Sequence, residues 1–169
     1  MDERVNPEPS ADERLTLTGF LEWYRLTIPA KLDGLNEEQA RQRVVGSDTT
    51  LIGLVRHLAE VERNWFRRRF RGEDAPPIWY SDADPDGDFH PAPADTLAQS
   101  LAIYQRECDI SRSITADAAS LDELTVAPIR DYGAPVSLRW ILVHMIEETA
   151  RHAGHIDIIR EIVDGTTGE

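Results

Sequence analysis

A glutamate and two histidines interrupt an apolar helical stripe near the C-terminus, in the segment EETARHAGHIDIIRE. A helix advances 100° per residue, so with Glu148 at 0° His152 falls at about 40° and His155 at about −20°. The apolar residues of this helix fall between about 20° and 80°; they are Leu138, Ile141, Met145, Ile156, Ile159 and Val163. His152 therefore lies inside the stripe and Glu148 at its edge. An unpaired carboxylate is costly to bury there, so the sequence predicts a partner for Glu148, and a cation would serve.

A second apolar stripe, in LIGLVRHLAEVERNWF, contains the complementary residue His57, one position before Leu58 and three after Leu54. Glu148 and His152 are four residues apart, which holds their Cβ atoms about 5 to 6 Å from each other and suits two ligands of one ion. With His57 from a facing helix, the set becomes two histidines and one glutamate. Three protein ligands leave a coordination position open, as in catalytic zinc sites, whereas structural zinc sites are closed by four protein ligands.

The same residues also permit an interpretation without a metal. A buried glutamate and histidine can pair with each other, and a single histidine on an apolar face is usually a hydrogen-bonded core residue. Nitrogen and oxygen ligands do not choose among Zn, Ni, Co and Fe. Other chemistries lack support, because the chain has no P-loop, GxGxxG, GxSxG or HExxH motif. Cys108, the only cysteine, is expected to be a small core residue.

Segments with helical periodicity must position these residues. We expect four long helices, over residues 12–35, 47–71, 94–119 and 138–163. Pro29 is expected to kink or stop the first, and Ser137 and Gly165 to begin and end the fourth. A short helix should open at Asn36, with Gln39 in capping-box spacing. Strand signals are nearly absent, so the expected fold is an all-α four-helix bundle.

Length and composition favour one domain, over residues 12–165, behind a disordered arm over residues 1–11. The chain has 31 acidic and 18 basic residues and a net charge of −13, which argues against nucleic acid as a partner. The arginines crowded into residues 63–71 fit the C-terminal end of a helix, where the helix dipole favours cations. The absence of an apolar leader or long apolar segment, with a single cysteine, predicts a cytoplasmic protein without a membrane span.

The connection over residues 73–93 is long and rich in Pro, Asp and Gly. A loop of that length in a compact domain is usually functional or loose. Its aromatic residues Trp79, Tyr80 and Phe89 either roof a pocket or fasten the loop to the bundle. We expect the loop to help form the substrate side of the site.

The sequence also predicts the locations of four further polar residues. His90, in the loop, is expected to be exposed. His144 lies one turn before Glu148, so it either orients the carboxylate or faces the surface. Glu60 and Asp157 are expected to face solvent.

The segments LIGLVRHLAEVERNWF and HMIEETARHAGHIDIIRE resemble the DinB/YfiT-like superfamily of metal-binding four-helix bundles, and the resemblance extends from the first helix to Gly165. It implies an up-down-down-up bundle whose metal ligands fall on His57, Glu148 and His152 in this chain. Many relatives carry H-x-G-Q at the end of the second motif, and here His155 stands in place of Gln. His155 is therefore the candidate catalytic residue, with a substrate contact, a ligand-orienting role and alternative ligation all left open.

The glutamate ligand and the motifs LVRHLAEVER and RHAGHIDIIRE resemble the actinobacterial branch that includes mycothiol-dependent maleylpyruvate isomerase and mycothiol S-transferases. This resemblance implies an enzyme that transfers a low-molecular-weight thiol, such as mycothiol, to an electrophilic small molecule. The cofactor would be Zn²⁺ or Ni²⁺, with the thiol sulfur at the open position. A homodimer is also implied, because bundles of this kind are often dimers.

Two other functions fit the same residues. In the first, the protein is a non-catalytic, stress-associated bundle whose metal only stabilises the fold. In the second, it is a metal-dependent isomerase or hydrolase that uses bound water at the open position.

Overall fold

The computed structural model describes residues 4–129 and 132–168. Its long helices are α1 (Glu13–Leu32), α3 (Leu51–Glu62) continued by the π-helix η1 (Arg63–Phe70), α4 (Leu97–Asp117) and α5 (Leu138–Asp164). The connections hold the short helix α2 (Glu37–Ala40) and the 3-10 turn η2 (Gly87–Phe89). The described residues form no strand, only two isolated β-bridges. The predicted all-α class is thus confirmed, and no helix in the described part of the chain is long and apolar enough to cross a membrane.

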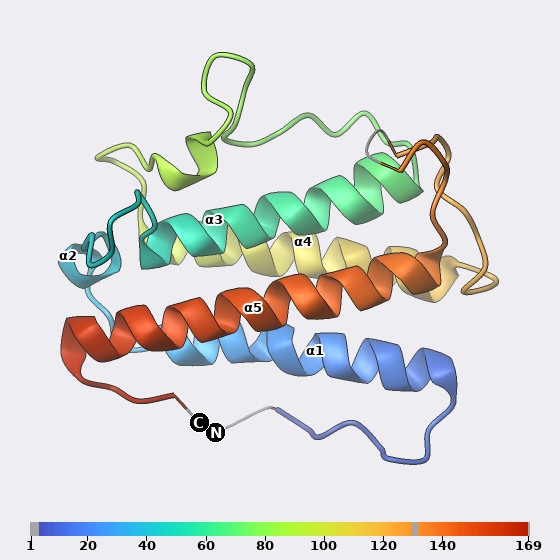
Figure 1. Cartoon of the computed structure of the whole chain (residues 1–169), viewed down its shortest axis with the longest axis horizontal. Coiled ribbons are helices and arrows are strands. Elements are labelled where there is room, and N and C mark those ends of the chain that lie inside the picture. Colours follow the sequence, from blue (N-terminus) through green and yellow to red (C-terminus); the bar gives the residue numbers. More distant parts are fainter. Residues whose placement is uncertain (1–3, 130–131, 169) are drawn as a thin grey trace.

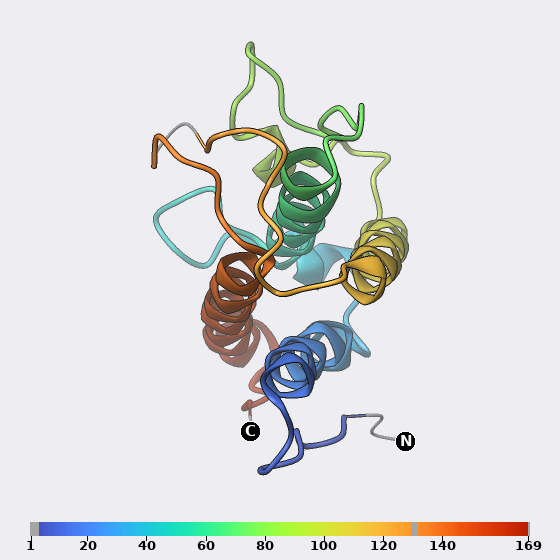
Figure 2. The ribbon, with the colours of Figure 1, turned by 90° about the vertical axis from the view of Figure 1, so that its right-hand side faces the viewer.

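The helices run in up-down-down-up order, with α1 and α5 pointing one way and α3 and α4 the other (Figure 1). Seen from one end, the four helices stand at the corners of a square (Figure 2). α1 packs mainly on α5 and α3 mainly on α4, while α3 also packs against α5. The contact between α3 and α5 brings together the two helices that carry the candidate ligands.

Side-chain caps set the helix boundaries much as predicted. Asn36 and Gln39 form the expected capping box at α2, and the Ser137 side chain accepts a hydrogen bond from the backbone N–H of Trp140 at the start of α5. Gly165 ends α5 with a φ of 79°, in the left-handed region where glycine is favoured. The expected helix ends therefore follow from local chemistry.

The first three long helices are shorter than predicted: the first ends at Leu32, the second begins at Leu51 and the third at Leu97. Two of them also differ in internal detail. Pro29 neither stops nor interrupts α1, which continues to Leu32; its ring costs only one intrahelical hydrogen bond, in the last turns of the helix. The second long helix changes from α to π at Arg63, and its end is closed by a hydrogen bond from the Arg71 N–H to the Phe66 carbonyl at 3.0 Å. This change of helix type has no counterpart in the hydrophobic pattern.

The core consists of two clusters of buried apolar side chains, one toward each end of the bundle. Cys108 is buried in the first cluster, as predicted. A buried ion pair also crosses the core and joins α1 to α3, with Arg25 Nε and Nη2 each donating to a Glu62 carboxylate oxygen at 2.8 Å. The predicted arm falls partly on residues 1–3, which lie outside the described residues, while Pro7 lies against Gly19 of α1.

Candidate metal centre

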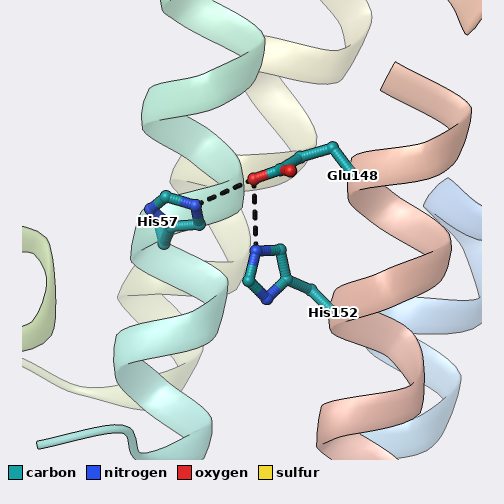
Figure 3. A group of neighbouring side chains, drawn as sticks. All are labelled: His57, Glu148 and His152. Carbon is teal, nitrogen blue, oxygen red and sulfur yellow. Dashed lines mark hydrogen bonds and ion pairs between the residues drawn. The ribbon is translucent and has the colours of Figure 1, made fainter. Parts of the chain in front are cut away.

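His57 of α3 and the pair Glu148 and His152 of α5 meet between the two helices (Figure 3). One ligand atom from each residue lies within 4.8 Å of the others. His57 Nε2 is 3.1 Å and His152 Nε2 is 3.2 Å from the same atom, Glu148 Oε1. The three side chains are 25%, 17% and 13% exposed, in the order His57, Glu148 and His152, so the cluster is mostly buried yet reachable from solvent.

The local sequence explains this convergence. Leu54 and Leu58 are buried on either side of His57, which sets the rotation of α3 and turns the imidazole toward α5. On α5, Met145 and Ile156 are fully buried and set the rotation of that helix in the same way. The spacing of four residues then stacks Glu148 and His152 on one face. The three residues predicted as ligands are therefore brought together, and whether they bind a metal stays a prediction.

Both histidines have their second ring nitrogen engaged. His57 Nδ1 is 2.8 Å from Oδ2 of Asp88, a residue that is only 6% exposed. His152 Nδ1 is 3.3 Å from His155 Nδ1, in a pairing that needs one donor and one acceptor. An imidazole that donates through Nδ1 keeps the Nε2 lone pair for a cation. Both Nε2 atoms face Glu148, so the arrangement suits joint ligation.

The charges around His57 determine its protonation. Burial alone would lower the pKa of His57, but hydrogen bonds to Asp88 and Glu148 outweigh burial and raise it to about 9. Hydrogen bonds from His152 and His57 hold the pKa of Glu148 well below its ordinary value, against the effect of burial. Burial and the neighbouring His152 both lower the pKa of His155, which favours the neutral ring. The cluster thus attracts positive charge, which a divalent cation can supply in place of the proton on His57.

Asp88 belongs to the long loop over residues 73–93, and α3 holds this part of the loop in place. Arg56 Nη2 donates to the Gly87 carbonyl at 3.0 Å, and the Arg56 guanidinium lies 4.6 Å from the centre of the Trp79 ring. Phe89 stacks on His57 with ring centres 5.2 Å apart. The loop is therefore fastened to the bundle directly over the candidate metal centre.

The prediction that Glu60 faces solvent is wrong. Glu60 is 3% exposed, and its Oε1 accepts hydrogen bonds from the backbone N–H groups of Ile78 and Trp79 at 2.6 and 2.7 Å. The irregular loop leaves these donors without strand or helix partners, so a buried carboxylate satisfies them. Helical periodicity alone does not reveal a loop that covers the outer face of α3.

The other polar residues lie away from the three candidate ligands. His144 lies among aromatic rings. Its ring centre is 5.1 Å from that of Trp140, on which it stacks, and 4.8 Å from that of Trp65, so the structure does not place it against Glu148. His90 is exposed, as predicted, and pairs with Asp84. Asp157 is partly exposed and forms an ion pair with Lys31.

One large cavity of the described structure does not contain the three candidate ligands. It has a volume of about 770 Å³ and lies between α1 and α4, with Arg25, Arg112 and Leu21 among its lining residues. Arg25 and Arg112 are both engaged there, by Glu62 and Glu22 respectively. This cavity is therefore separate from the candidate metal centre.

Asp88 is the residue of the site that the sequence analysis missed. It lies in an Asp- and Gly-rich loop without periodicity, where one acidic residue resembles the next. A signal did exist in the neighbouring Phe89, an aromatic residue in an otherwise polar segment, which indicates a loop that returns to the bundle.

Fold and site together define a class of protein: an up-down-down-up helical bundle with a candidate divalent-metal centre of two histidines and one glutamate between its second and fourth long helices. A family model described as mycothiol-S-transferase matches residues 16–165. The chain belongs to this family, which is part of the DinB/YfiT-like superfamily, and the resemblance seen in the sequence is confirmed. No curated protein matches the chain.

Proposed function

We propose that the protein catalyses the divalent-metal-dependent transfer of mycothiol to an electrophilic small molecule. Membership of the mycothiol-S-transferase family supports the thiol. The observation that carries the metal dependence is the convergence of His57 Nε2 and His152 Nε2 on Glu148 Oε1. Both imidazoles have Nδ1 engaged, so both can present Nε2 to one ion.

The donor set fits a borderline cation such as Zn²⁺ or Ni²⁺. Imidazole nitrogen and carboxylate oxygen are common ligands of both metals, and three protein ligands leave room for an exogenous one. The partial exposure of the three side chains agrees with an open position. A structural site would be expected to have a fourth protein ligand and deeper burial.

A bound divalent cation would supply Lewis acidity that stabilises a thiolate at neutral pH. His57, Glu148 and His152 would hold it, while Asp88 and His155 keep the two imidazoles in the required orientation. The remaining ring nitrogen of His155, Nε2, is proposed to contact the substrate. The loop over residues 73–93 covers the same side of the bundle.

The nucleophile is proposed to come from the co-substrate. Cys108 is fully buried, and burial raises the pKa of its thiol well above the ordinary value, so it is a poor source of thiolate. In the proposed reaction the mycothiol proton goes to solvent and the sulfur forms a new bond to an electrophilic carbon. The displaced group leaves with the electron pair of the broken bond, which balances the transfer.

An assay with chlorodinitrobenzene as the electrophile tests this proposal. We expect the mycothiol adduct to form with Zn²⁺- or Ni²⁺-loaded protein and not with chelator-treated protein, as measured by mass spectrometry. His152→Ala should abolish adduct formation, while the matched variant His90→Ala, which changes an exposed histidine outside the site, should not. Loss of the electrophile at the same rate without thiol would instead support a hydrolase that uses bound water.

A further inference from the structure

A cavity of about 260 Å³ lies beside His57, on the side of the ring that faces the long loop. One wall comes from α3 and η1, including Val61 and Asn64, and the other from the loop, including Tyr80 and Asp86. His57 belongs both to this cavity and to the three candidate ligands. A group that fills the cavity therefore lies next to His57, while Glu148 and His152 lie outside its lining.

The walls of this cavity accept hydrogen bonds and carry negative charge. Two of its three carboxylates are already engaged, Glu60 by backbone N–H groups and Asp88 by His57. Asp86 is exposed at the edge; Asn64 is half-buried and its Oδ1 accepts one hydrogen bond, from Arg69 Nε at 3.4 Å, which leaves its second lone pair and its amide N–H groups for a ligand. No arginine or lysine is among the lining residues, and the nearby Arg68 donates to the Tyr80 hydroxyl at 2.7 Å. His57 is the one lining side chain that can carry positive charge, so the three carboxylates leave a net negative lining, which suits hydroxyl donors and disfavours anions.

The shape of the cavity is fixed before a ligand arrives. Arg56 donates to the Gly87 carbonyl and forms an ion pair with Asp95, which secures the loop at η2 and just beyond its C-terminal end. Gly87 lies so close to the Trp79 carbonyl oxygen that a Cβ at this position would clash with it. A preformed cavity loses little conformational entropy when it binds a ligand.

We propose that this cavity binds the sugar portion of the thiol co-substrate: a neutral, hydroxyl-rich ring that donates to Asp86 and Asn64 while its thiol arm reaches the metal centre. This inference rests on the proposed function and adds to it the place where the protein distinguishes mycothiol from other thiols. Ligand pockets usually have volumes of about 300–1,000 Å³, so a cavity of about 260 Å³ suits one ring of the mycothiol pseudodisaccharide. Glutathione, a thiol with two carboxylates, is disfavoured by the same walls.

The test uses zinc-loaded protein and N-acetylglucosaminyl-inositol, which has the sugar portion of mycothiol without its cysteine and keeps the amide nitrogen neutral. Binding is measured by ligand-observed NMR, which does not depend on turnover. We expect binding to wild type and a weakening of about 3- to 10-fold in Asp86→Asn and in Asn64→Leu, because each variant removes one hydrogen-bonding group. Asp82→Asn, a matched change at an exposed loop position outside the cavity, should bind as wild type does.

A kinetic experiment compares mycothiol with glutathione as the thiol co-substrate. Asp86→Asn should raise the KM for mycothiol and reduce the preference for mycothiol over glutathione, with kcat and metal content unchanged. If N-acetylglucosaminyl-inositol does not bind wild type, or binds both cavity variants equally well, this assignment is overturned even when mycothiol transfer is observed. If the sugar binds as described but no mycothiol adduct forms, the cavity assignment stands and the proposed reaction fails.

Discussion

Asp88 determines how His57 is presented, because its carboxylate lies 2.8 Å from His57 Nδ1 in a buried position. We expect Asp88→Ala to weaken Zn²⁺ binding by about 10- to 100-fold, as is usual for the loss of a carboxylate that orients a ligating histidine. The measurement is a competition titration against a chromophoric chelator, with Asp82→Ala as the exposed control. Equal Zn²⁺ affinities in the two variants would show that Asp88 does not orient His57 for metal binding.

His57 also makes the stability of the metal-free protein depend on pH. Its pKa rises from 6.5 to about 9 on folding, so the folded state binds this proton more tightly than the unfolded chain does. The stabilisation is fully present below about pH 6.5 and is lost as the pH rises to about 9.

We therefore expect the free energy of unfolding of chelator-treated protein, measured with urea, to fall across this interval. His57→Gln should show a flatter dependence, because its side chain does not titrate. A stability that rises with pH in the wild type, or an equal slope in His57→Gln, contradicts the assignment.

The three candidate ligands could be predicted from the sequence because they lie on regular helices. Spacing and rotation placed Glu148 and His152 on one face, and the buried neighbours of His57 placed it opposite. Asp88 and Glu60 could not be placed, because the partners of both depend on how an irregular loop crosses α3. The roles of residues in such loops are decided by tertiary contacts rather than by periodicity.

At the scale of the elements, the long helices and most of their caps follow from periodicity and capping chemistry. The π-helix η1 does not, because its residues RNWFRRRF have an ordinary helical pattern. Two arginines of this π-helix, Arg63 and Arg67, both donate hydrogen bonds to the buried carboxylate of Glu107 on α4, at 2.9 and 3.2 Å. Glu107 is fully buried between the two helices. The pairing therefore depends on how η1 packs against α4 and cannot be predicted from the sequence of either helix alone.

The buried ion pair between α1 and α3 gives a prediction about helix packing. Replacing Glu62 by Leu leaves the Arg25 guanidinium buried without its partner, and we expect a loss of about 3–5 kcal/mol in the free energy of unfolding. The double variant Arg25→Leu/Glu62→Leu should recover most of that loss, because neither charge of this pair is then buried. Urea unfolding of both variants measures the effect.

Glu13→Leu, which breaks an exposed contact with Arg139, is the matched control and should change stability little. A Glu62→Leu protein as stable as this control would show that the buried pair does not hold α1 on α3.

At the scale of the whole molecule, the apolar core does not depend on a metal. Both core clusters consist of apolar side chains contributed mostly by the long helices, and the candidate ligands lie at their edge. We expect chelator-treated protein to keep its helical circular dichroism at 25 °C and to unfold in one cooperative transition at a lower Tm. Loss of helical signal on chelation would instead favour a metal whose role is structural.

The central claim is that His57, Glu148 and His152 hold one divalent metal ion. It is tested most directly by the metal content of tag-free protein, determined by inductively coupled plasma mass spectrometry for wild type, His152→Ala and His90→Ala. The account predicts about one equivalent of a transition metal in wild type and His90→Ala, and loss of the metal in His152→Ala with the helical spectrum intact. A wild-type protein that holds no metal and binds neither added Zn²⁺ nor added Ni²⁺ would contradict it, and the three residues would then be a buried polar cluster only.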